Sequence, residues 1–409
     1  MKYALTFPDG KLEGKISLPT SKSISNRLLI MKALSSRDFH IDGLSDSDDT
    51  KLLQQALSST ADIIDVGHAG TSMRFLAAYF AATNQTKILT GSERMKNRPI
   101  NDLVDALNQI GADIKYLEKA GFPPIVTSGK QLSGNYVEIR GNVSSQFISA
   151  MLLIAPTLHD GLTIRIVGDS VSTSYIRMTQ KLMKQCGIDS SFKNNTIAVS
   201  RQEYHSEGIS VERDYSAASY WYQMAALADD AELLLEGVTD KSLQGDAIIS
   251  QLAFPLGVNT EYTYEGAVLT KHKNFCLAFG YDLVNSPDLV QTMAVACCLK
   301  NIRFRFAGVQ TLRVKETDRI TALQNELIKL SFVVKEISPD GTIEWNGERV
   351  EPQKTAIIST YNDHRMAMSF APSAMFYPEI MIENPHVVSK SYPNFWNDLK
   401  NIGVIINDK

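Results

Sequence analysis

The sequence predicts a two-domain protein of the mixed α/β class (α/β or α+β). Strand-like and helix-like segments alternate along the whole chain, which is typical of sheets covered by helices. A chain of 409 residues is too long for one hydrophobic core, so two domains are expected. A strand-like run that ends in small polar residues and enters a helix recurs six times, which indicates one repeated supersecondary unit.

The repeated strand–turn–helix element can be followed by one marker residue in each copy. The first interval between markers is 48 residues, and the other four are 74, 72, 72 and 76 residues. Each turn should present free backbone N–H groups and the positive end of a helix dipole, and both attract an anion. The first three copies are separated from the last three near residues 212–214. We therefore expect the chain to cross between the two domains at that point and near Pro19. The markers are Lys22, Gly70, Ser144, Ser216, Asp288 and His364.

Composition excludes several classes of protein. The net charge of −4 argues against a broad nucleic-acid-binding surface. Four cysteines and seven histidines show no metal-ligand spacing, so no metal site is expected. The first ten residues lack the apolar core of a signal peptide, and the longest apolar run, residues 150–156, is too short to span a bilayer. We therefore expect a cytoplasmic protein without a membrane segment, and a monomer.

The first copy of the element, residues 18–34, joins a polar turn to an apolar helical pattern. Lys22 and Arg27 would place a point charge and a forked guanidinium beside a helix N-terminus, which suits a phosphate or carboxylate. Ser23 lies in the same turn. An ordinary N-cap followed by solvated cations is the alternative, and this stretch alone does not decide between them.

The next two copies carry glycine and hydroxyl groups. Gly70 lies at a helix start, where a glycine lets a ligand approach the backbone closely. Ser144, Ser145 and Gln146 open another helix, and either simple N-capping or binding of a polyol or phosphate explains them. Arg98, just before Pro99 and a helical pattern, is a better candidate for a fixed role than its solvated neighbours.

The later copies carry acids and bases. Asp288 would lie in the first turn of an apolar helix, where it either complements the helix dipole or accepts a proton from a substrate alcohol. Residues 313–319 (RVKETDR) are the densest motif, and on a helix they would form surface ion pairs worth only ~0.2–0.5 kcal/mol each. Arg365 and Lys390 follow in two further polar motifs.

Taken in order, these motifs resemble the 5-enolpyruvylshikimate-3-phosphate (EPSP) synthase family of enolpyruvyl transferases. The matching stretches extend from Ser21 to Pro393, and RVKETDR and NDHRMAM are the specific ones. The resemblance implies a two-domain inside-out α/β barrel with three βαβαββ units in each domain and the active site in the cleft between them. The implied domains are residues 1–19 with 213–409, and residues 20–212 inserted between them.

The resemblance also implies the reaction and the residues that perform it. The 5-hydroxyl of shikimate 3-phosphate would attack C2 of phosphoenolpyruvate, and the tetrahedral intermediate would lose phosphate, with no metal or organic cofactor. Asp288 would accept the hydroxyl proton, Glu316 would handle the proton at C3, and Lys22 and Lys390 could protonate the leaving phosphate. The implied ligands of shikimate 3-phosphate are Lys22, Ser23, Arg27, Ser144, Ser145, Ser172, Tyr175, Asp288 and Lys315. The implied ligands of phosphoenolpyruvate are Lys22, Gly70, Arg98, Gln146, Arg319, Arg365 and Lys390.

The chain departs from the family pattern without losing an acid, a base or a phosphate-binding cation. His68 stands where the family commonly has Asn, and Phe75 stands where it usually has Pro. Residues 173–174 replace a Lys-Pro pair, and residues 311–312 replace a common Asn and Trp. One alternative is the sister transferase acting on UDP-N-acetylglucosamine, but that family uses a cysteine in its first half and none occurs here before Cys186. The other is a non-catalytic anion-binding relative. Because Gly70 is retained, inhibition by glyphosate is expected.

Overall fold

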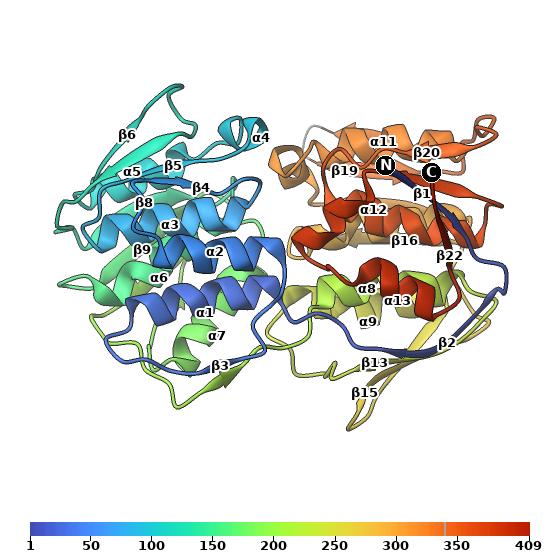
Figure 1. Ribbon diagram of the computed structural model, residues 1–409, viewed down its shortest axis with the longest axis horizontal. Coiled ribbons are helices and arrows are strands. Elements are labelled where there is room, and N and C mark those ends of the chain that lie inside the picture. Colours follow the sequence, from blue (N-terminus) through green and yellow to red (C-terminus); the bar gives the residue numbers. More distant parts are fainter. Residues whose placement is uncertain (339–340) are drawn as a thin grey trace. The chain divides into compact units, whose positions relative to one another are not determined.

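The chain divides into two units, each held together by its own internal contacts. The computed structural model describes residues 1–338 and 341–409. The discontinuous unit comprises Met1–Thr20 and Glu212–Lys409, and the inserted unit comprises Ser21–Val211. The chain therefore passes from one unit to the other twice, and both termini belong to the discontinuous unit (Figure 1).

The inserted unit, all of which the structure describes, repeats one sheet pattern. Its sheets have the orders β4-β5-β7-β6 and β8-β9-β11-β10, and a parallel pair, β12-β3, completes it. In both four-stranded sheets a helix connects the first two strands, which are parallel, and a hairpin then adds two antiparallel strands. Its elements are α1 (Lys22–Leu34), β3 (Ile41–Asp42), α2 (Asp48–Ser58), β4 (Ile63–Asp65), α3 (Gly70–Ala82), β5 (Lys87–Thr90), α4 (Glu93–Lys96), α5 (Asn101–Gln109), β6 (Asp113–Tyr116), β7 (Ile125–Ser128), β8 (Tyr136–Arg140), α6 (Ser145–Ile154), β9 (Leu162–Val167), α7 (Thr173–Gln185), β10 (Ser191–Lys193), β11 (Thr196–Val199) and β12 (Ile209–Ser210).

The discontinuous unit repeats the same pattern in the residues that are described. Its sheets have the orders β2-β13-β15-β14, β16-β17-β19-β18 and β20-β21-β1-β22, each with a parallel pair followed by antiparallel strands. Strand β1 comes from the N-terminus and completes the last sheet. The elements are β1 (Lys2–Thr6), β2 (Lys11–Ile16), α8 (Tyr215–Leu227), β13 (Asp230–Glu236), α9 (Ile249–Ala253), β14 (Val258–Tyr262), β15 (Gly266–Lys271), β16 (Ala278–Asp282), α10 (Val290–Leu299), β17 (Arg303–Ala307), α11 (Arg319–Lys329), β18 (Lys335–Ser338), β19 (Thr342–Trp345), β20 (Ala356–Ile358), α12 (His364–Phe370), β21 (Ile380–Glu383), α13 (Phe395–Asn401) and β22 (Ile405–Asp408).

These orders confirm the mixed α/β class and the repeated βαβαββ unit. Five copies have a four-stranded sheet in the described part of the chain, and the sixth is reduced to the two-stranded pair β12-β3. The sheets of each unit remain separate there, so no continuous barrel closes. The short first interval between markers agrees with the reduced copy, because a unit without its hairpin needs fewer residues.

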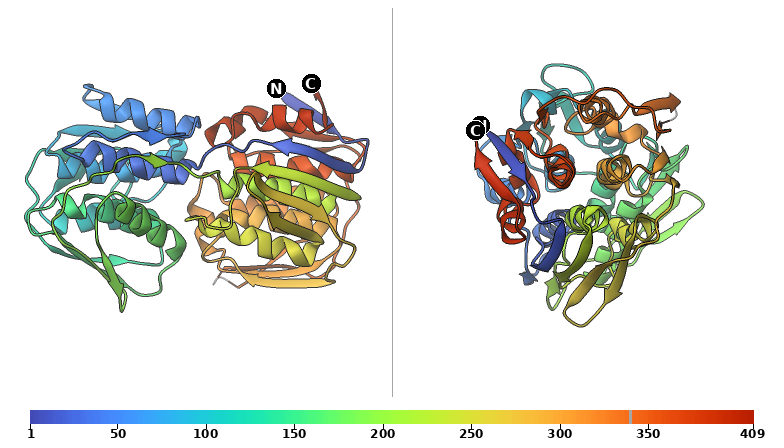
Figure 2. Two further views of the ribbon diagram at one scale, coloured as in Figure 1. Left: turned by 90° about the horizontal axis from the view of Figure 1, so that it is seen from below. Right: turned by 90° about the vertical axis from the view of Figure 1, so that its right-hand side faces the viewer.

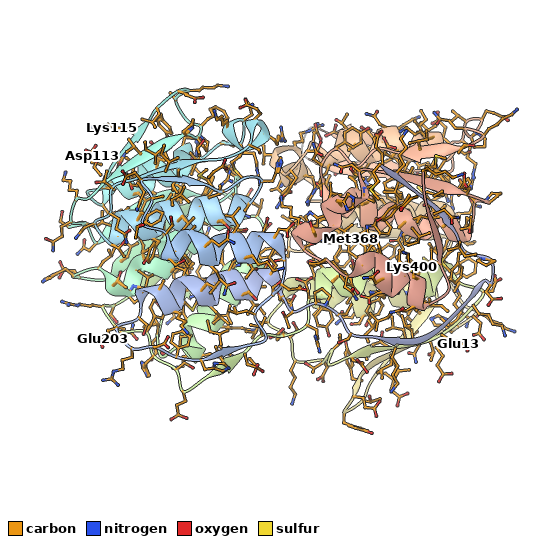
Figure 3. The ribbon with its side chains drawn as sticks, viewed as in Figure 1. Glu13, Asp113, Lys115, Glu203, Met368 and Lys400 are labelled. Carbon is orange, nitrogen blue, oxygen red and sulfur yellow. The ribbon has the colours of Figure 1, made fainter. Side chains whose placement is uncertain are left out.

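Helices, and not sheets, form the centre of each unit. Every residue of α10 and α12 is buried, as is nearly all of α3, α6 and α8. These helices carry apolar residues on every face, with a few buried polar side chains among them, and such a pattern favours burial all round. The strands lie around the helices (Figure 2) and alternate between the two kinds of residue. Glu13 of β2 and the pair Asp113 and Lys115 of β6 therefore lie outside, whereas Met368 of α12 is buried (Figure 3). The arrangement is inside out because the continuously apolar segments are the helices.

All six marker residues lie at helix starts. Lys22, Gly70 and His364 are the first residues of α1, α3 and α12. Ser144 is the N-cap of α6, Ser216 is the second residue of α8, and a 3₁₀ turn holding Asp288 leads into α10. The sequence therefore located every turn at which the chain enters a central helix.

Candidate functional site

Lys22 begins α1 in the inserted unit and forms an ion pair there. Its Nζ lies 3.1 Å from Oδ2 of Asp49, which belongs to the first turn of α2. The Lys22 side chain is 14% exposed and that of Asp49 only 7%. This ion pair holds the ammonium group beside the helix start and offsets part of its charge.

Arg27 is buried one turn further along α1, among neutral partners. Its Nε donates to Thr179 Oγ1 at 2.7 Å, and Nη2 donates to Ser149 Oγ at 3.3 Å. Nη1 donates to the carbonyl of Ser23 at 2.8 Å. Burial lowers the pKa of Arg27 to about 10. Because these partners carry no charge, none of them neutralises the guanidinium.

Two aromatic rings flank the Arg27 guanidinium. Its Cζ lies 5.4 Å from the ring centroid of Phe75 and 5.8 Å from that of Tyr175, both within cation–π range. Phe75 is one of the departures from the family pattern, and here its buried ring stabilises a cation. Ser172, the residue that caps α7, is buried with a positive φ of 54°. The structure therefore brings Ser23, Arg27 and Tyr175 together.

Gly70 and Arg98 are in direct contact in the inserted unit. A Cβ atom at position 70 would lie only 2.8 Å from Cζ of Arg98, closer than real Cβ contacts allow. The Arg98 side chain is 5% exposed. Arg74 of α3 connects both segments, since it donates to the carbonyls of Gly70 and Pro99. A side chain at position 70 would therefore displace the Arg98 guanidinium from the place that it occupies beside the glycine.

The start of α6 lies near the start of α3. Ser144 Oγ accepts from the backbone N–H of Gln146, which confirms the capping role. The Gln146 amide donates to Thr71 Oγ1 at 3.2 Å. Ser145 is buried in the first turn. Capping by Ser144 leaves its side chain facing the helix start, so capping and a ligand contact are compatible.

In the discontinuous unit, Arg319 is the centre of a buried network of charges. It is 2% exposed and pairs with three carboxylates from three segments. Its Nε lies 2.7 Å from Asp363 Oδ2, Nη1 lies 2.9 Å from Asp288 Oδ1, and Nη2 lies 2.9 Å from Glu316 Oε2. Burial by itself lowers the pKa of Arg319, but the three negative charges raise it above its ordinary value.

Two further cations complete the network. Lys390 Nζ lies 3.1 Å from the second oxygen of Glu316, and Arg365 Nη2 lies 2.8 Å from the second oxygen of Asp288. Each of these carboxylates is thus held between two cations, an arrangement that favours its ionised form. Lys315 is half-buried next to Glu316 in the chain. Asp288, Glu316, Arg319, Arg365 and Lys390 therefore form one cluster, as the motifs suggested.

The interpretation of residues 313–319 as a helix with surface pairs is wrong. A 3₁₀ helix ends at Val314, a turn follows, and α11 begins only at Arg319 with Asp318 as its N-cap. The turn lets Glu316 and Arg319 face the buried network, whereas Arg313 pairs with Asp318 and Glu336 at the surface. Only half of the motif is therefore a solvated charge run.

Several members of these clusters were not assigned a role from the sequence. Thr179 and Ser149 bind Arg27, Asp49 binds Lys22, and Asp363 binds Arg319. Asp49 and Asp363 each lie at a helix start, where capping alone accounts for an acid. Asp363 does cap α12, through the N–H of Arg365. A hydroxyl inside a helix, such as that of Thr179, gives no sequence signal.

No helix in the described residues is long and apolar enough to cross a membrane. Cys297 and Cys298 are buried in α10 and belong to the hydrophobic core. Of the other departures from the family pattern, His68 lies with its Nδ1 3.0 Å from Ser92 Oγ, and Leu312 is buried in the 3₁₀ helix.

The comparisons with known proteins agree along the whole chain. The family model for EPSP synthase (3-phosphoshikimate 1-carboxyvinyltransferase) matches residues 7–61 and 52–399. The 3-phosphoshikimate 1-carboxyvinyltransferase of Bacteroides fragilis strain YCH46 is 48% identical over 404 residues, or 98% of both chains. That of Aliivibrio fischeri strain MJ11 is 35% identical, covering 97% of this chain and 98% of its own.

Two solved structures share the fold. An EPSP synthase from Acinetobacter baumannii superposes with a TM-score of 0.77 at 21% identity, covering 100% of both chains. The enolpyruvyl transferase NikO from Streptomyces tendae has a TM-score of 0.72 at 15% identity, with 99% and 98% covered. At sequence identities of 21% and 15%, these structural similarities establish the fold of the chain and nothing further.

Proposed function

The chain belongs to the EPSP synthase family, and we propose that it transfers the enolpyruvyl group of phosphoenolpyruvate to the 5-hydroxyl of shikimate 3-phosphate. The observation that carries the proposal is the buried network around Arg319, in which two carboxylates lie between cations. Such a network combines bases that can move protons with cations that offset the charges of two anionic substrates.

The proposed chemistry has two steps, an addition and an elimination, and each step needs two proton transfers. Asp288 takes the proton of the 5-hydroxyl group while the hydroxyl oxygen attacks C2 of phosphoenolpyruvate. Glu316 adds a proton to C3, giving the tetrahedral intermediate, so its carboxyl group must be protonated at this step, a form that the negative charges of the bound substrates favour. Glu316 takes a proton back from C3 when phosphate leaves. Lys22 and Lys390 donate to the leaving phosphate. Overall, the proton of the 5-hydroxyl ends on the phosphate, because the proton that Asp288 takes replaces the one that the lysine gives to the leaving group.

Binding of shikimate 3-phosphate is proposed to depend mainly on the inserted unit. Arg27 supports this, because its described hydrogen bonds all go to uncharged groups and leave its charge available to a ligand anion. An arginine with aromatic rings on its sides is also rigid, and a rigid fork loses little entropy when it binds. The proposed ligands are Lys22, Ser23, Arg27, Ser144, Ser145, Ser172 and Tyr175, with Asp288 and Lys315 from the discontinuous unit.

Phosphoenolpyruvate is proposed to need cations from both units. Arg98, resting on Gly70, and Arg365, paired with Asp288, are each positioned by described contacts. Both guanidinium groups can grip a carboxylate or phosphate with two hydrogen bonds. The full proposed set is Lys22, Gly70, Arg98, Gln146, Arg319, Arg365 and Lys390.

The proposal is tested by measuring phosphate release from phosphoenolpyruvate with and without shikimate 3-phosphate. Release should require shikimate 3-phosphate and fall about 10²–10⁴-fold in Glu316→Gln, the range for loss of an acid–base group. Glu336→Gln is the matched control, since Glu336 pairs with Arg313 away from the network. Release that needs UDP-N-acetylglucosamine instead would assign the sister activity, and no release with either substrate would identify a non-catalytic binder.

A further inference from the structure

Asp246 is a buried carboxyl group that the reaction scheme above does not use. It lies in the 3₁₀ helix Gly245–Ile248 of the discontinuous unit and is 4% exposed. Its Oδ2 accepts a hydrogen bond of 2.5 Å from Ser216 Oγ, while no described residue donates to Oδ1. A buried carboxyl group with one oxygen unsatisfied costs free energy, so it calls for a functional or structural reason.

Ser216 connects Asp246 to the charged network. Arg365 Nη2 lies 3.4 Å from Ser216 Oγ and 2.8 Å from Asp288 Oδ2, so one nitrogen reaches both groups. The other terminal nitrogen, Nη1, lies 3.4 Å from Tyr220 Oη and 3.5 Å from the carbonyl oxygen of Asp288. Asp246, Ser216, Arg365 and Asp288 therefore form a continuous chain of polar contacts from the protein interior to the proposed base.

The segment carrying Asp246 is tied to the segment carrying Asp288. Ser286, next to the 3₁₀ turn of Asp288, donates to the carbonyl of Gly245 at 3.1 Å. The two carboxyl groups consequently belong to neighbouring turns that are fixed to each other.

We propose that Asp246 is a positioning residue, which acts through Ser216 to orient the Arg365 guanidinium against Asp288. The role rests on the assignment of Arg365 to phosphoenolpyruvate made above. Asp246 itself does not touch a substrate. It fixes the direction in which Arg365 presents its remaining N–H groups, and its negative charge, when present, partly offsets the charge of Arg365.

The charged neighbours of Asp246 come from three elements. Asp288 and Arg365 face it from the turn before α10 and from α12, and Asp214, the N-cap of α8, adds a further negative charge. Burial, followed by the charge of Asp288, raises the pKa of Asp246 to about 7. Around neutral pH the carboxyl group is therefore partly protonated, and raising the pH adds a negative charge beside Arg365.

Kinetic constants of four variants test the role. Asp246→Ala and Ser216→Ala remove the link to Arg365, so we expect the KM for phosphoenolpyruvate to rise about tenfold, the effect of a lost 1.4 kcal/mol. The KM for shikimate 3-phosphate should change less than threefold. Asp398→Asn is the matched control, because Asp398 is buried in the same unit but bonds Tyr392 and Asn394. Arg365→Lys tests the assignment of Arg365 as a ligand of phosphoenolpyruvate, on which the role of Asp246 rests.

The pH profile supplies a readout that a merely structural role would not change. Asp246→Asn resembles the protonated carboxyl group in shape and charge, so it should match the natural protein near pH 6. At pH 8.5 the natural protein carries an extra buried negative charge, and its KM for phosphoenolpyruvate should exceed that of Asp246→Asn several-fold. Comparing the two proteins at each pH removes the ionisation of the substrates themselves.

The outcomes separate the inference from the function on which it rests. An unchanged KM for phosphoenolpyruvate in Arg365→Lys would overturn the assignment of Arg365. A raised KM for phosphoenolpyruvate in Arg365→Lys would support the assignment of Arg365. If the KM were then unchanged in Asp246→Ala and Ser216→Ala, and the pH profile of Asp246→Asn were parallel to that of the natural protein, the role of Asp246 would be overturned. Loss of thermal stability alone in the Asp246 variants would show a structural carboxyl group.

Discussion

The two units surround their key arginines with opposite kinds of partners. In the inserted unit, Arg27 is buried among hydroxyl groups, a carbonyl and aromatic rings, so none of these partners cancels its charge. In the discontinuous unit, Arg319 is buried among three carboxylates. Burial lowers the pKa of Arg27, whereas the carboxylates raise that of Arg319 despite its burial.

This difference indicates different tasks. An uncompensated buried cation is costly until an anion arrives, so the Arg27 cluster is suited to anchoring a phosphate. A charge-matched network is stable without ligand and holds carboxylates at fixed positions, which suits proton transfer. We therefore expect the inserted unit to act mainly in binding (the binding half) and the discontinuous unit mainly in proton transfer (the chemical half).

The largest effect should come from a change in the chemical half. Asp288→Asn removes the proposed proton acceptor while keeping its size, so kcat should fall about 10²–10⁴-fold. The melting temperature and the affinity for shikimate 3-phosphate should change much less. Asp282→Asn is the control, because Asp282 is an exposed residue of β16 that bonds the Val284 N–H. A kcat within tenfold of the natural value would contradict the assignment of Asp288.

A change in the binding half should act on affinity. Arg27→Met removes charged hydrogen bonds worth roughly 1.5–3 kcal/mol, so the dissociation constant of shikimate 3-phosphate should rise about 10–150-fold by titration calorimetry. Thr179→Val removes only one neutral partner of Arg27 and should weaken binding by less. If Arg27→Met binds as tightly as the natural protein, the Arg27 cluster is purely structural.

Gly70→Ala should have a moderate effect that spares the Arg27 cluster. The new Cβ would overlap the Arg98 guanidinium, and moving that side chain off its rotamer costs about 0.5–1.5 kcal/mol. The KM for phosphoenolpyruvate should rise about two- to tenfold. Glyphosate should inhibit the natural protein and inhibit Gly70→Ala less strongly. Turnover of the natural protein in millimolar glyphosate without inhibition would contradict this prediction.

The smallest expected effect is on the pH dependence of stability. The native pKa of Asp246, about 7, exceeds its ordinary value of 3.8, so between these values only the native state holds the proton. Stability therefore falls as the pH rises through this window, and the loss is complete above pH 7. Asp246→Asn cannot ionise, so its melting temperature should not show this fall.

Above pH 7 the melting temperature of Asp246→Asn should be higher by about 2–4 °C, which corresponds to ~1 kcal/mol in a domain of this size. The buried amide offsets part of the gain, because it adds a donor that needs a partner. Differential scanning calorimetry at pH 4, 6 and 8 measures the effect. A constant difference at all three values would show that Asp246 does not titrate in the native protein.

The sequence by itself determined the mixed α/β class, the repeated unit and the location of every central helix start. These features are local: periodicity sets the elements, and a polar turn before an apolar run sets a helix N-terminus. The resemblance carried by RVKETDR and NDHRMAM then identified the family. Lys22, Asp288 and Arg365 could be singled out because charged residues at helix starts are visible along the chain.

Only the tertiary structure decided which groups surround each charge. Thr179 and Ser149 lie more than 120 residues from Arg27 in the sequence, and Asp246 reaches Arg365 through Ser216. The structure also placed Arg319 inside the protein, where surface pairing had been one interpretation. Long-range packing determines these neighbours, and burial and electrostatic interactions depend on neighbours in space, which the local pattern of a sequence does not record.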